Sequence, residues 1–135
     1  MSIAKAIAQL RALNEPVPRP ARLPSDDEID QVESELSVPF HSDFRRYLRE
    51  ASDVTYGTRE PVTLTLPDSH TDLRTVARNA WRVGVPGDWI PVCEDNGDYF
   101  CVTPNGRITF WSHDGSSDES WPSLADWLIQ EWIQQ

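Results

Sequence analysis

One dipeptide in this chain, His113-Asp114, has the residue types of a metal-dependent phosphohydrolase. Such an enzyme needs further histidines and carboxylates around the same metal ion, because two side chains do not complete a coordination sphere. The other two histidines, His41 and His70, lie in contexts typical of a helix start and a loop. Since a two-residue motif is a weak signal, the pattern favours a structural role for His113 and Asp114 at the end of a strand.

Three carboxylates, Glu94, Asp95 and Asp98, cluster in one short segment and offer the oxygen ligands that calcium prefers. The regular spacing and the closing glutamate of a calcium loop are missing, which favours a hairpin turn with solvated acids. The chain also lacks a glycine-rich phosphate loop and a glycine–serine nucleophile elbow. We therefore predict that the protein is not an enzyme and uses no metal ion or cofactor.

Cys93 and Cys101 are the only cysteines, and they flank the Asn-Gly pair at residues 96–97, which is typical of a two-residue hairpin turn. This turn would place Cys93 opposite Phe100 and Cys101 opposite Val92. Since successive strand residues point to opposite faces of a sheet, the two sulfurs would lie on different sides. We predict two unpaired thiols in or near the core, with no disulfide and no zinc site.

Acidic residues outnumber basic ones by 22 to 12, and the imbalance is concentrated in the second half of the chain. Residues 83–135 contain nine acids against Arg107 alone, which gives a net charge of −8 out of a total of −10. Such a field repels phosphate backbones and attracts basic proteins. Two interpretations of the acidity remain open: a general effect on solubility, or a surface that recognises a basic partner.

All six tryptophans lie after residue 80, in the same half of the chain as the acidic excess. Tryptophan is a large core residue and is also enriched at the centres of protein interfaces. Trp81 and Trp127 occupy helix positions in register with other apolar residues, which predicts a place in the core. Trp111 and Trp121 bracket the polar segment 112–120, and for these two both alternatives, core packing and contact with a partner, stay open.

The elements that must position these residues begin with three helices. Apolar residues recur at helical spacing over residues 2–13, and an extended connector is expected over residues 14–24, where four prolines exclude a helix. The sequence Ser-Asp-Asp-Glu at residues 25–28 is a capping box that opens a second helix. A third helix is expected over residues 41–52, where the apolar residues fall on one side.

Strands and one more helix are expected after that. Residues 61–66 alternate between apolar and polar and predict a half-buried strand, followed by a helix over residues 71–83 that ends at Gly84. Three short strands separated by Asn-Gly turns are expected at residues 89–93, 99–103 and 107–111. A polar loop and a final helix from Ser123 complete the chain. This order predicts an α+β fold, an antiparallel β-meander with N-terminal helices, one inserted helix and a C-terminal helix packed on it.

The length of 135 residues is that of one domain, so we assign residues 1–135 to a single domain in which residues 1–21 form an N-terminal helix and a Pro-rich connector. No apolar run is long enough to span a bilayer and the first residues lack a signal-peptide pattern, which predicts a cytoplasmic protein.

The final helix is apolar on more than one face. Its surplus would either cover the first helix or form a self-association patch and a weak homodimer.

Four segments in order along roughly residues 22–130 carry a family pattern. They are Leu23-Pro24 with the helical residues through Phe44-Arg45 and Tyr47-Leu48, then Trp89-Ile90-Pro91-Val92 with the turn Asp95-Asn96-Gly97-Asp98 and the strand Tyr99-Phe100-Cys101-Val102, then Ile108-Thr109-Phe110-Trp111-Ser112-His113-Asp114, and finally Ser123-Leu124-Ala125-Asp126-Trp127-Leu128. In these segments the chain resembles the SMI1/KNR4 (SUKH) superfamily. It departs from that pattern at residues 51–54, Ala-Ser-Asp-Val, where relatives often carry Asn-Gly.

The resemblance implies a binding module. Members of this superfamily are mostly bacterial immunity proteins that block polymorphic or contact-dependent toxins by direct contact. The toxins are often nucleases or deaminases, whose sites are basic because they hold phosphate, so an acidic inhibitor fits the role. The fungal relatives imply an alternative, a non-enzymatic regulatory or scaffold protein of the SMI1/KNR4 type.

The expected partner is therefore a basic protein toxin domain, with no direct binding of nucleic acid or membrane. We expect it to meet the acidic hairpin turn and the polar loop after the third strand of the meander, with two tryptophans available as apolar anchors. The predicted partner-binding residues are Glu94, Asp95, Asp98, Trp111, Asp114, Asp118, Glu119 and Trp121.

Overall fold

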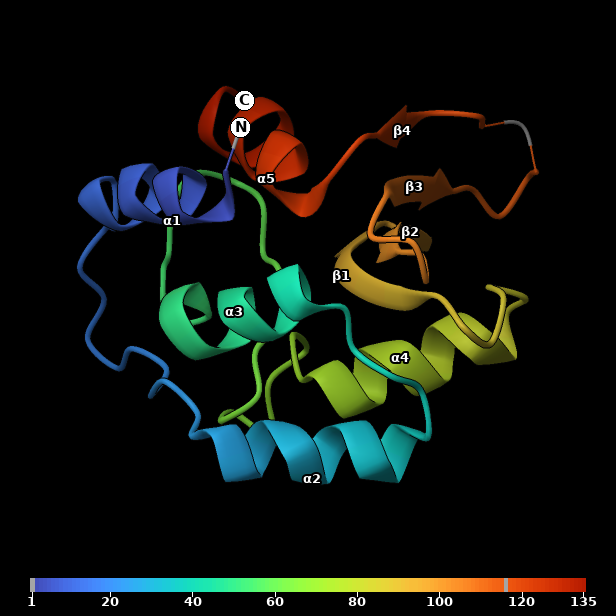
Figure 1. The fold of residues 1–135 in the computed structure, drawn as a ribbon, viewed down its shortest axis with the longest axis horizontal. Helices are drawn as coiled ribbons and strands as arrows, with labels where there is room; N and C mark the ends of the chain where they lie inside the picture. The colour runs from blue at the N-terminus through green and yellow to red at the C-terminus, as the bar shows by residue number, and fades with distance from the viewer. Residues whose placement is uncertain (1, 116) are drawn as a thin grey trace.

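Helices come first along the chain, and a small sheet follows in the second half (Figure 1). The computed structural model describes residues 2–115 and 117–135. Within these residues the helices are α1 (Ile3–Ala12), α2 (Asp26–Leu36), α3 (Ser42–Ala51), α4 (Leu73–Arg82) and α5 (Leu124–Trp127), which continues as the π-helical segment η1 (Leu128–Ile133). Residues 14–24 contain neither helix nor strand, as their prolines predict.

The predicted capping box is present at the start of α2. The Ser25 hydroxyl accepts the Glu28 N–H at 3.2 Å, and the Glu28 carboxylate accepts the Ser25 N–H at 3.0 Å. Arg22 binds both oxygens of the same carboxylate at 2.8 Å. The hydrogen bond from Arg22 and that from the Ser25 backbone lower the pKa of Glu28 to about 2. Local side-chain chemistry therefore sets where this helix begins.

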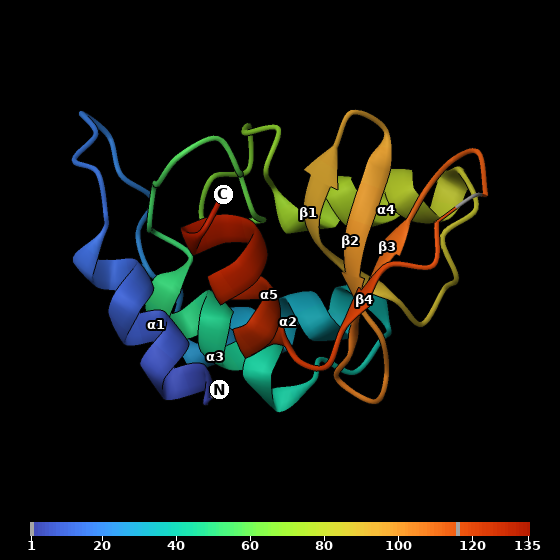
Figure 2. The ribbon, with the colours of Figure 1, turned by 90° about the horizontal axis from the view of Figure 1, so that it is seen from above.

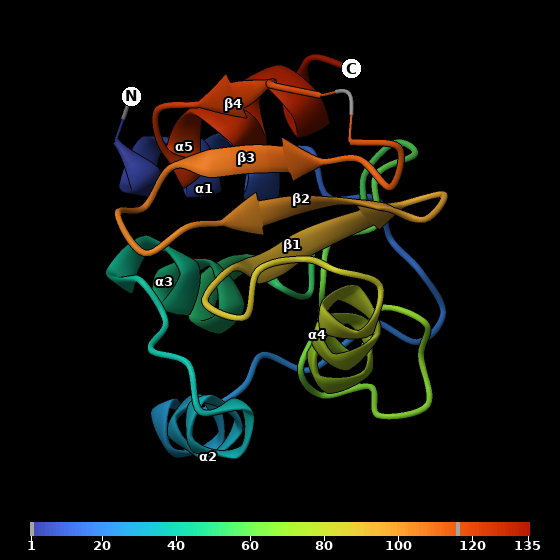
Figure 3. The same ribbon diagram turned by 90° about the vertical axis from the view of Figure 1, so that its right-hand side faces the viewer.

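The sheet is an antiparallel meander with the strand order β1-β2-β3-β4 (Figure 3). Its strands are β1 (Ile90–Asp95), β2 (Asp98–Val102), β3 (Ile108–Trp111) and β4 (Ser120–Trp121). The prediction of an α+β fold built on a meander is confirmed. The two-residue strand β4 falls where we expected the end of a polar loop, and it forms because the chain returns along β3 and pairs Thr109 with Ser120.

The prediction of a strand over residues 61–66 is wrong. Only two isolated bridges form there, between Pro61 and Cys93 and between Thr63 and Asp72. The Val62 N–H donates to a carbonyl of β1, whereas the next N–H, that of Thr63, donates across to Thr71 at 2.9 Å. Because the segment bonds to two different neighbours in turn, no continuous ladder develops. The apolar alternation instead reflects the burial of Val62 and Leu64 in the core.

The hairpin register agrees with the prediction at one cysteine and differs at the other. Cys93 lies opposite Phe100 as expected, but Cys101 lies opposite Pro91 and not opposite Val92. The cause is an irregularity in β1 between Pro91 and Cys93, where proline has no N–H to donate to the ladder. Both thiols are unpaired and buried, as predicted.

Helices pack on both sides of this sheet. Helix α4 contacts β1, while Trp127 of α5 packs on the Phe100 ring of β2 with 5.3 Å between ring centroids (Figures 1 and 2). Trp127 is fully buried, as predicted, and Trp81 is half-buried against the core. Helix α1 packs against α3, α5 and η1, so the surplus apolar face of the final helix covers the first helix.

Candidate partner-binding surface

The turn between β1 and β2 presents carboxylates at one end of the sheet. Asn96 and Gly97 have φ values of 51° and 90°, the left-handed pair that a two-residue hairpin turn requires. The Glu94 carboxylate accepts the Gly97 N–H at 3.0 Å and closes the turn. Asp95 and Asp98 then face each other across the ladder, where like charges repel. Each of these two aspartates is matched with a cationic or protonatable side chain.

Asp98 joins the hairpin to the loop that follows β3. Its Oδ1 accepts the backbone N–H of His113 at 2.9 Å and lies 2.6 Å from His113 Nδ1. The backbone hydrogen bond from His113, followed by that from its ring, lowers the pKa of Asp98. In turn the hydrogen bond to Asp98 raises the pKa of His113. The two acidic segments therefore extend from the same end of the sheet and are tied to each other (Figure 3).

Four of the predicted acids are exposed on this end: Glu94, Asp114, Asp118 and Glu119. Asp114 accepts a hydrogen bond from the Ser112 hydroxyl at 2.8 Å. Neither Asp118 nor Glu119 forms an ion pair within residues 2–115 and 117–135. Arg107, the one basic residue after position 82, precedes β3 and lies at the other end of that strand from His113. The negative charge is therefore gathered at one end of the sheet.

Arg59 forms an ion pair with Asp95, the other aspartate of the turn, and the sequence alone did not identify this arginine. Its guanidinium lies 3.3 Å from Asp95 and 3.2 Å from Glu131, and its central carbon lies 4.8 Å from the centroid of the Phe100 ring. The side chain is only 23% exposed. Arg59 thus neutralises part of the predicted acidic surface and ties the hairpin to the final helix. Its separation from Asp95 and Glu131 along the chain leaves no local sequence signal.

The two open tryptophans have different environments. Trp121 is 6% exposed and packs against Phe100 with 5.6 Å between ring centroids, so core packing is the alternative that applies, and Trp121 is not an exposed anchor. Trp111 is half-buried and lies 6.1 Å from the Tyr99 ring. Since Ile108 pairs with Trp121 and Tyr99 pairs with Trp111, the two indoles belong to opposite faces of the sheet. Of these two tryptophans, Trp111 is the one that is accessible to a partner.

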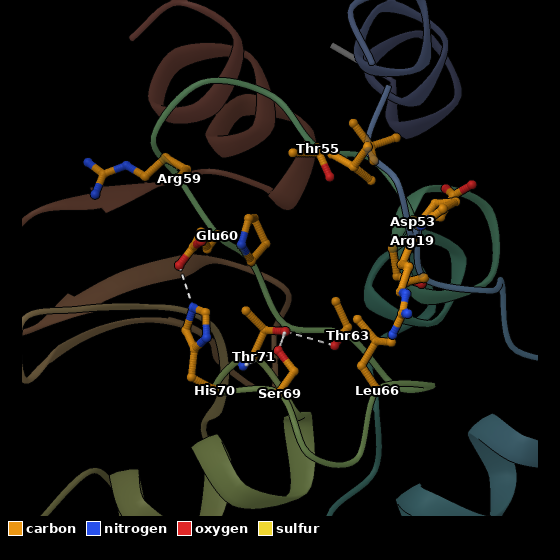
Figure 4. A pocket seen from close by; sticks show the side chains of 16 residues that line it. Arg19, Asp53, Thr55, Arg59, Glu60, Thr63, Leu66, Ser69, His70 and Thr71 are labelled. Carbon is orange, nitrogen blue, oxygen red and sulfur yellow. Dashed lines mark hydrogen bonds and ion pairs between the residues drawn. The ribbon is translucent and has the colours of Figure 1, made fainter. Parts of the chain in front are cut away.

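A cavity of about 180 Å³ lies beside this surface, between the connector and residues 52–71 (Figure 4). On one wall the Thr71 hydroxyl lies 2.9 Å from that of Thr63 and 2.7 Å from that of Ser69. On another wall the His70 ring points to the Glu60 carboxylate (Figure 4). Arg59 lines the cavity and also pairs with Asp95, so the cavity borders the acidic hairpin.

The structure gives the two cysteines a packing role. Burial raises the pKa of the Cys93 thiol to about 12 and raises that of the Cys101 thiol as well.

Within the described part of the chain, no three His, Cys, Asp or Glu side chains gather in a way that could hold a metal ion. In the same part, no helix has the length and apolar character to cross a membrane.

The geometry is that of an α+β fold with an acidic end formed by two joined loops. The family model SUKH_5, described as SMI1-KNR4 cell-wall, matches residues 3–133. The chain therefore belongs to the SMI1/KNR4 (SUKH) superfamily.

One solved structure is similar over the whole chain. It is a crystal structure of a protein from Pseudomonas syringae pv. tomato, with 42% sequence identity and a TM-score of 0.93. The similarity covers 98% of this chain and 99% of the Pseudomonas chain. No curated protein matches this sequence.

Proposed function

We propose that the protein is an immunity protein, which binds a cognate polymorphic or contact-dependent toxin and blocks it by direct contact. Membership in the SMI1/KNR4 superfamily supports this class of function. The observation that carries the proposal is the pair of hydrogen bonds between Asp98 and His113, which joins two acidic loops into one surface. A joined surface can meet one partner, whereas scattered acids would only aid solubility.

The proposed partner is a basic domain, such as a nuclease or another enzyme that binds phosphate. Complementary potentials raise the association rate and orient the two proteins before contact. Glu94, Asp118 and Glu119 are exposed at the acidic end and supply this attraction. We propose that inhibition takes place in the cytoplasm, and that it needs no catalytic step by this chain, since binding alone closes the toxin's site.

The test uses the toxin domain encoded by the gene next to this one, in a catalytically inactive form. Asp118→Lys is compared with Asp68→Lys, which makes the same charge change at an exposed acid in the turn ahead of α4. Two unit charges about 10 Å apart in water interact with ~0.4 kcal/mol. Reversing one charge replaces an attraction by a repulsion of equal size and changes the energy by ~0.8 kcal/mol, so it should lower the association rate about fourfold at low salt. We expect the Asp68 variant to change that rate much less.

Two results would contradict the proposal at different levels. If the wild-type protein does not bind a neighbouring toxin domain, or if cell-wall or signalling genes stand in its place, the regulatory or scaffold alternative is favoured. If the wild-type protein binds but both variants associate at equal rates over a range of salt, the acidic loops are not the surface that meets the toxin.

A further inference from the structure

An apolar patch lies where the end of α4 meets β3, outside the acidic loops. Val83, the residue that caps the C-terminus of α4, is 55% exposed. Leu13, which caps the C-terminus of α1, is 38% exposed, and these two are the large aliphatic side chains with most exposure in the described part of the chain. A single exposed aliphatic side chain is normal on a protein surface and by itself indicates no binding site. Val83 differs from Leu13 because a half-buried tryptophan, Trp111, lies near it, and such a pair is suited to contact with a partner.

The Trp111 ring is held against this patch from two sides. A methyl group built at Gly84 would lie 3.5 Å from Cζ2 of the indole, so the ring edge lies close to the backbone that follows Val83. On its strand the same ring lies 6.1 Å from that of Tyr99. A tryptophan fixed in this way loses little side-chain entropy when a partner covers its remaining exposed surface.

Acidic groups border the patch on the side of the sheet. Glu94 pairs with Tyr99, and Tyr99 pairs with Trp111, so these three side chains lie in a row on one face of the sheet. The chain continues from Trp111 to His113, which binds Asp98. Tyr99 lies within the electrostatic influence of both Glu94 and Arg82, so basic groups of a partner are best placed on the side of Glu94. The arrangement is an apolar centre with a charged rim.

We propose that Val83, Gly84 and Trp111 form the apolar anchor site of the interface, and that this site receives an apolar side chain of the basic partner. The inference rests on the immunity function proposed above and names the part of the surface that holds the complex together. A second copy of the chain fits less well, because each copy carries a net charge of −10 and the acidic rims would face each other. Of the two tryptophans that the sequence offers as apolar anchors, Trp111 lies at this site, whereas Trp121 is in the core.

The test compares Val83→Ser with Leu13→Ser in binding to the same inactive toxin domain. Both substitutions remove an exposed aliphatic side chain from a helix C-cap and leave the net charge unchanged, so they are matched in their effect on the fold. We expect Val83→Ser to raise the dissociation rate about fivefold with an unchanged association rate, and Leu13→Ser to change neither. Trp111→Ala should raise the dissociation rate about tenfold or more, and Trp111→Phe less.

The outcomes separate this inference from the proposed function. Wild-type binding with equal dissociation rates for the Val83 and Leu13 variants would overturn the anchor site and leave the immunity function standing. Absence of wild-type binding would overturn the function itself. Concentration-dependent dimerisation of the wild-type protein that Val83→Ser abolishes would assign the patch to a second copy of the chain and would also overturn the inference.

Discussion

Replacing Arg59 by methionine should destabilise the fold and at the same time strengthen the acidic surface. The guanidinium contacts Asp95, Glu131 and the Phe100 ring while it is only 23% exposed. Methionine retains much of the apolar stem, so the substitution removes chiefly the charge and its hydrogen bonds. Asp95 and Glu131 then lose their shared cation.

The expected loss of stability follows from these contacts. A cation over an aromatic ring at a partly exposed site contributes ~1 kcal/mol, and each partly exposed ion pair ~0.5 kcal/mol, which together give ~2 kcal/mol. For a chain of 135 residues the entropy of unfolding is ~0.28 kcal/mol/K, so the melting temperature should fall by ~7 °C. Arg59→Lys should lie between the two, because lysine keeps the charge without the planar fork.

The matched control is Arg107→Met, which removes an exposed arginine from the other end of β3. Arg107 donates one side-chain hydrogen bond, to the Ser120 hydroxyl at 2.9 Å, so we expect a change within about 0.5 kcal/mol. Both variants lower the net charge by one. Only Arg59→Met uncovers an acid at the acidic end, and it should raise the association rate with the basic toxin domain about twofold at low salt.

Calorimetry and stopped-flow binding measure the two effects independently. Equal melting temperatures for the Arg59 and Arg107 variants would refute the reasoning that Arg59 ties the hairpin to the final helix. An association rate that falls for Arg59→Met would refute the reasoning that Arg59 masks part of the binding surface.

Two further predictions concern titration and thiol chemistry. By NMR, the pKa of His113 should lie above its ordinary value in the wild-type protein, because of the hydrogen bond to Asp98, and should fall in Asp98→Asn; a pKa that does not move would contradict the contact. Because this pKa is raised on folding, the stabilisation from the pair is present at low pH, as long as Asp98 stays ionised. It is lost as the pH rises through the pKa of folded His113. A thiol reagent at pH 8 should leave Cys93 and Cys101 unmodified in the native protein and modify both after unfolding, because burial raises both pKa values; rapid reaction of the native protein would show that the thiols are accessible.

The features that could be predicted from the sequence depend on neighbours along the chain. The capping box at Ser25 and Glu28 involves residues three apart, and the Asn-Gly pair at residues 96–97 sets its turn through its own backbone preference. Grouping of the acids at one end of the sheet followed from the meander, since alternate loops of a meander lie at the same end.

The features that could not be predicted depend on residues far apart in sequence. Pro61 and Thr63 bridge to different segments, so the local alternation of residues 61–66 did not reveal the missing ladder. The burial of Trp121 depends on the pairing of β4 with β3. Because β4 is only two residues long, the sequence shows no alternation that would predict this strand. Arg59 reaches Glu131 across 72 positions, and no periodicity records such a contact.

Hydrogen–deuterium exchange of the complex with the inactive toxin domain tests the central claim most directly. Binding through the acidic end should slow exchange in residues 94–99 and 111–119 and at the end of α4, residues 82–84, while α2 (Asp26–Leu36) exchanges as in the free protein. Protection confined to α2, with unchanged exchange in both acidic loops, would contradict the account and place the interface on the acidic helix.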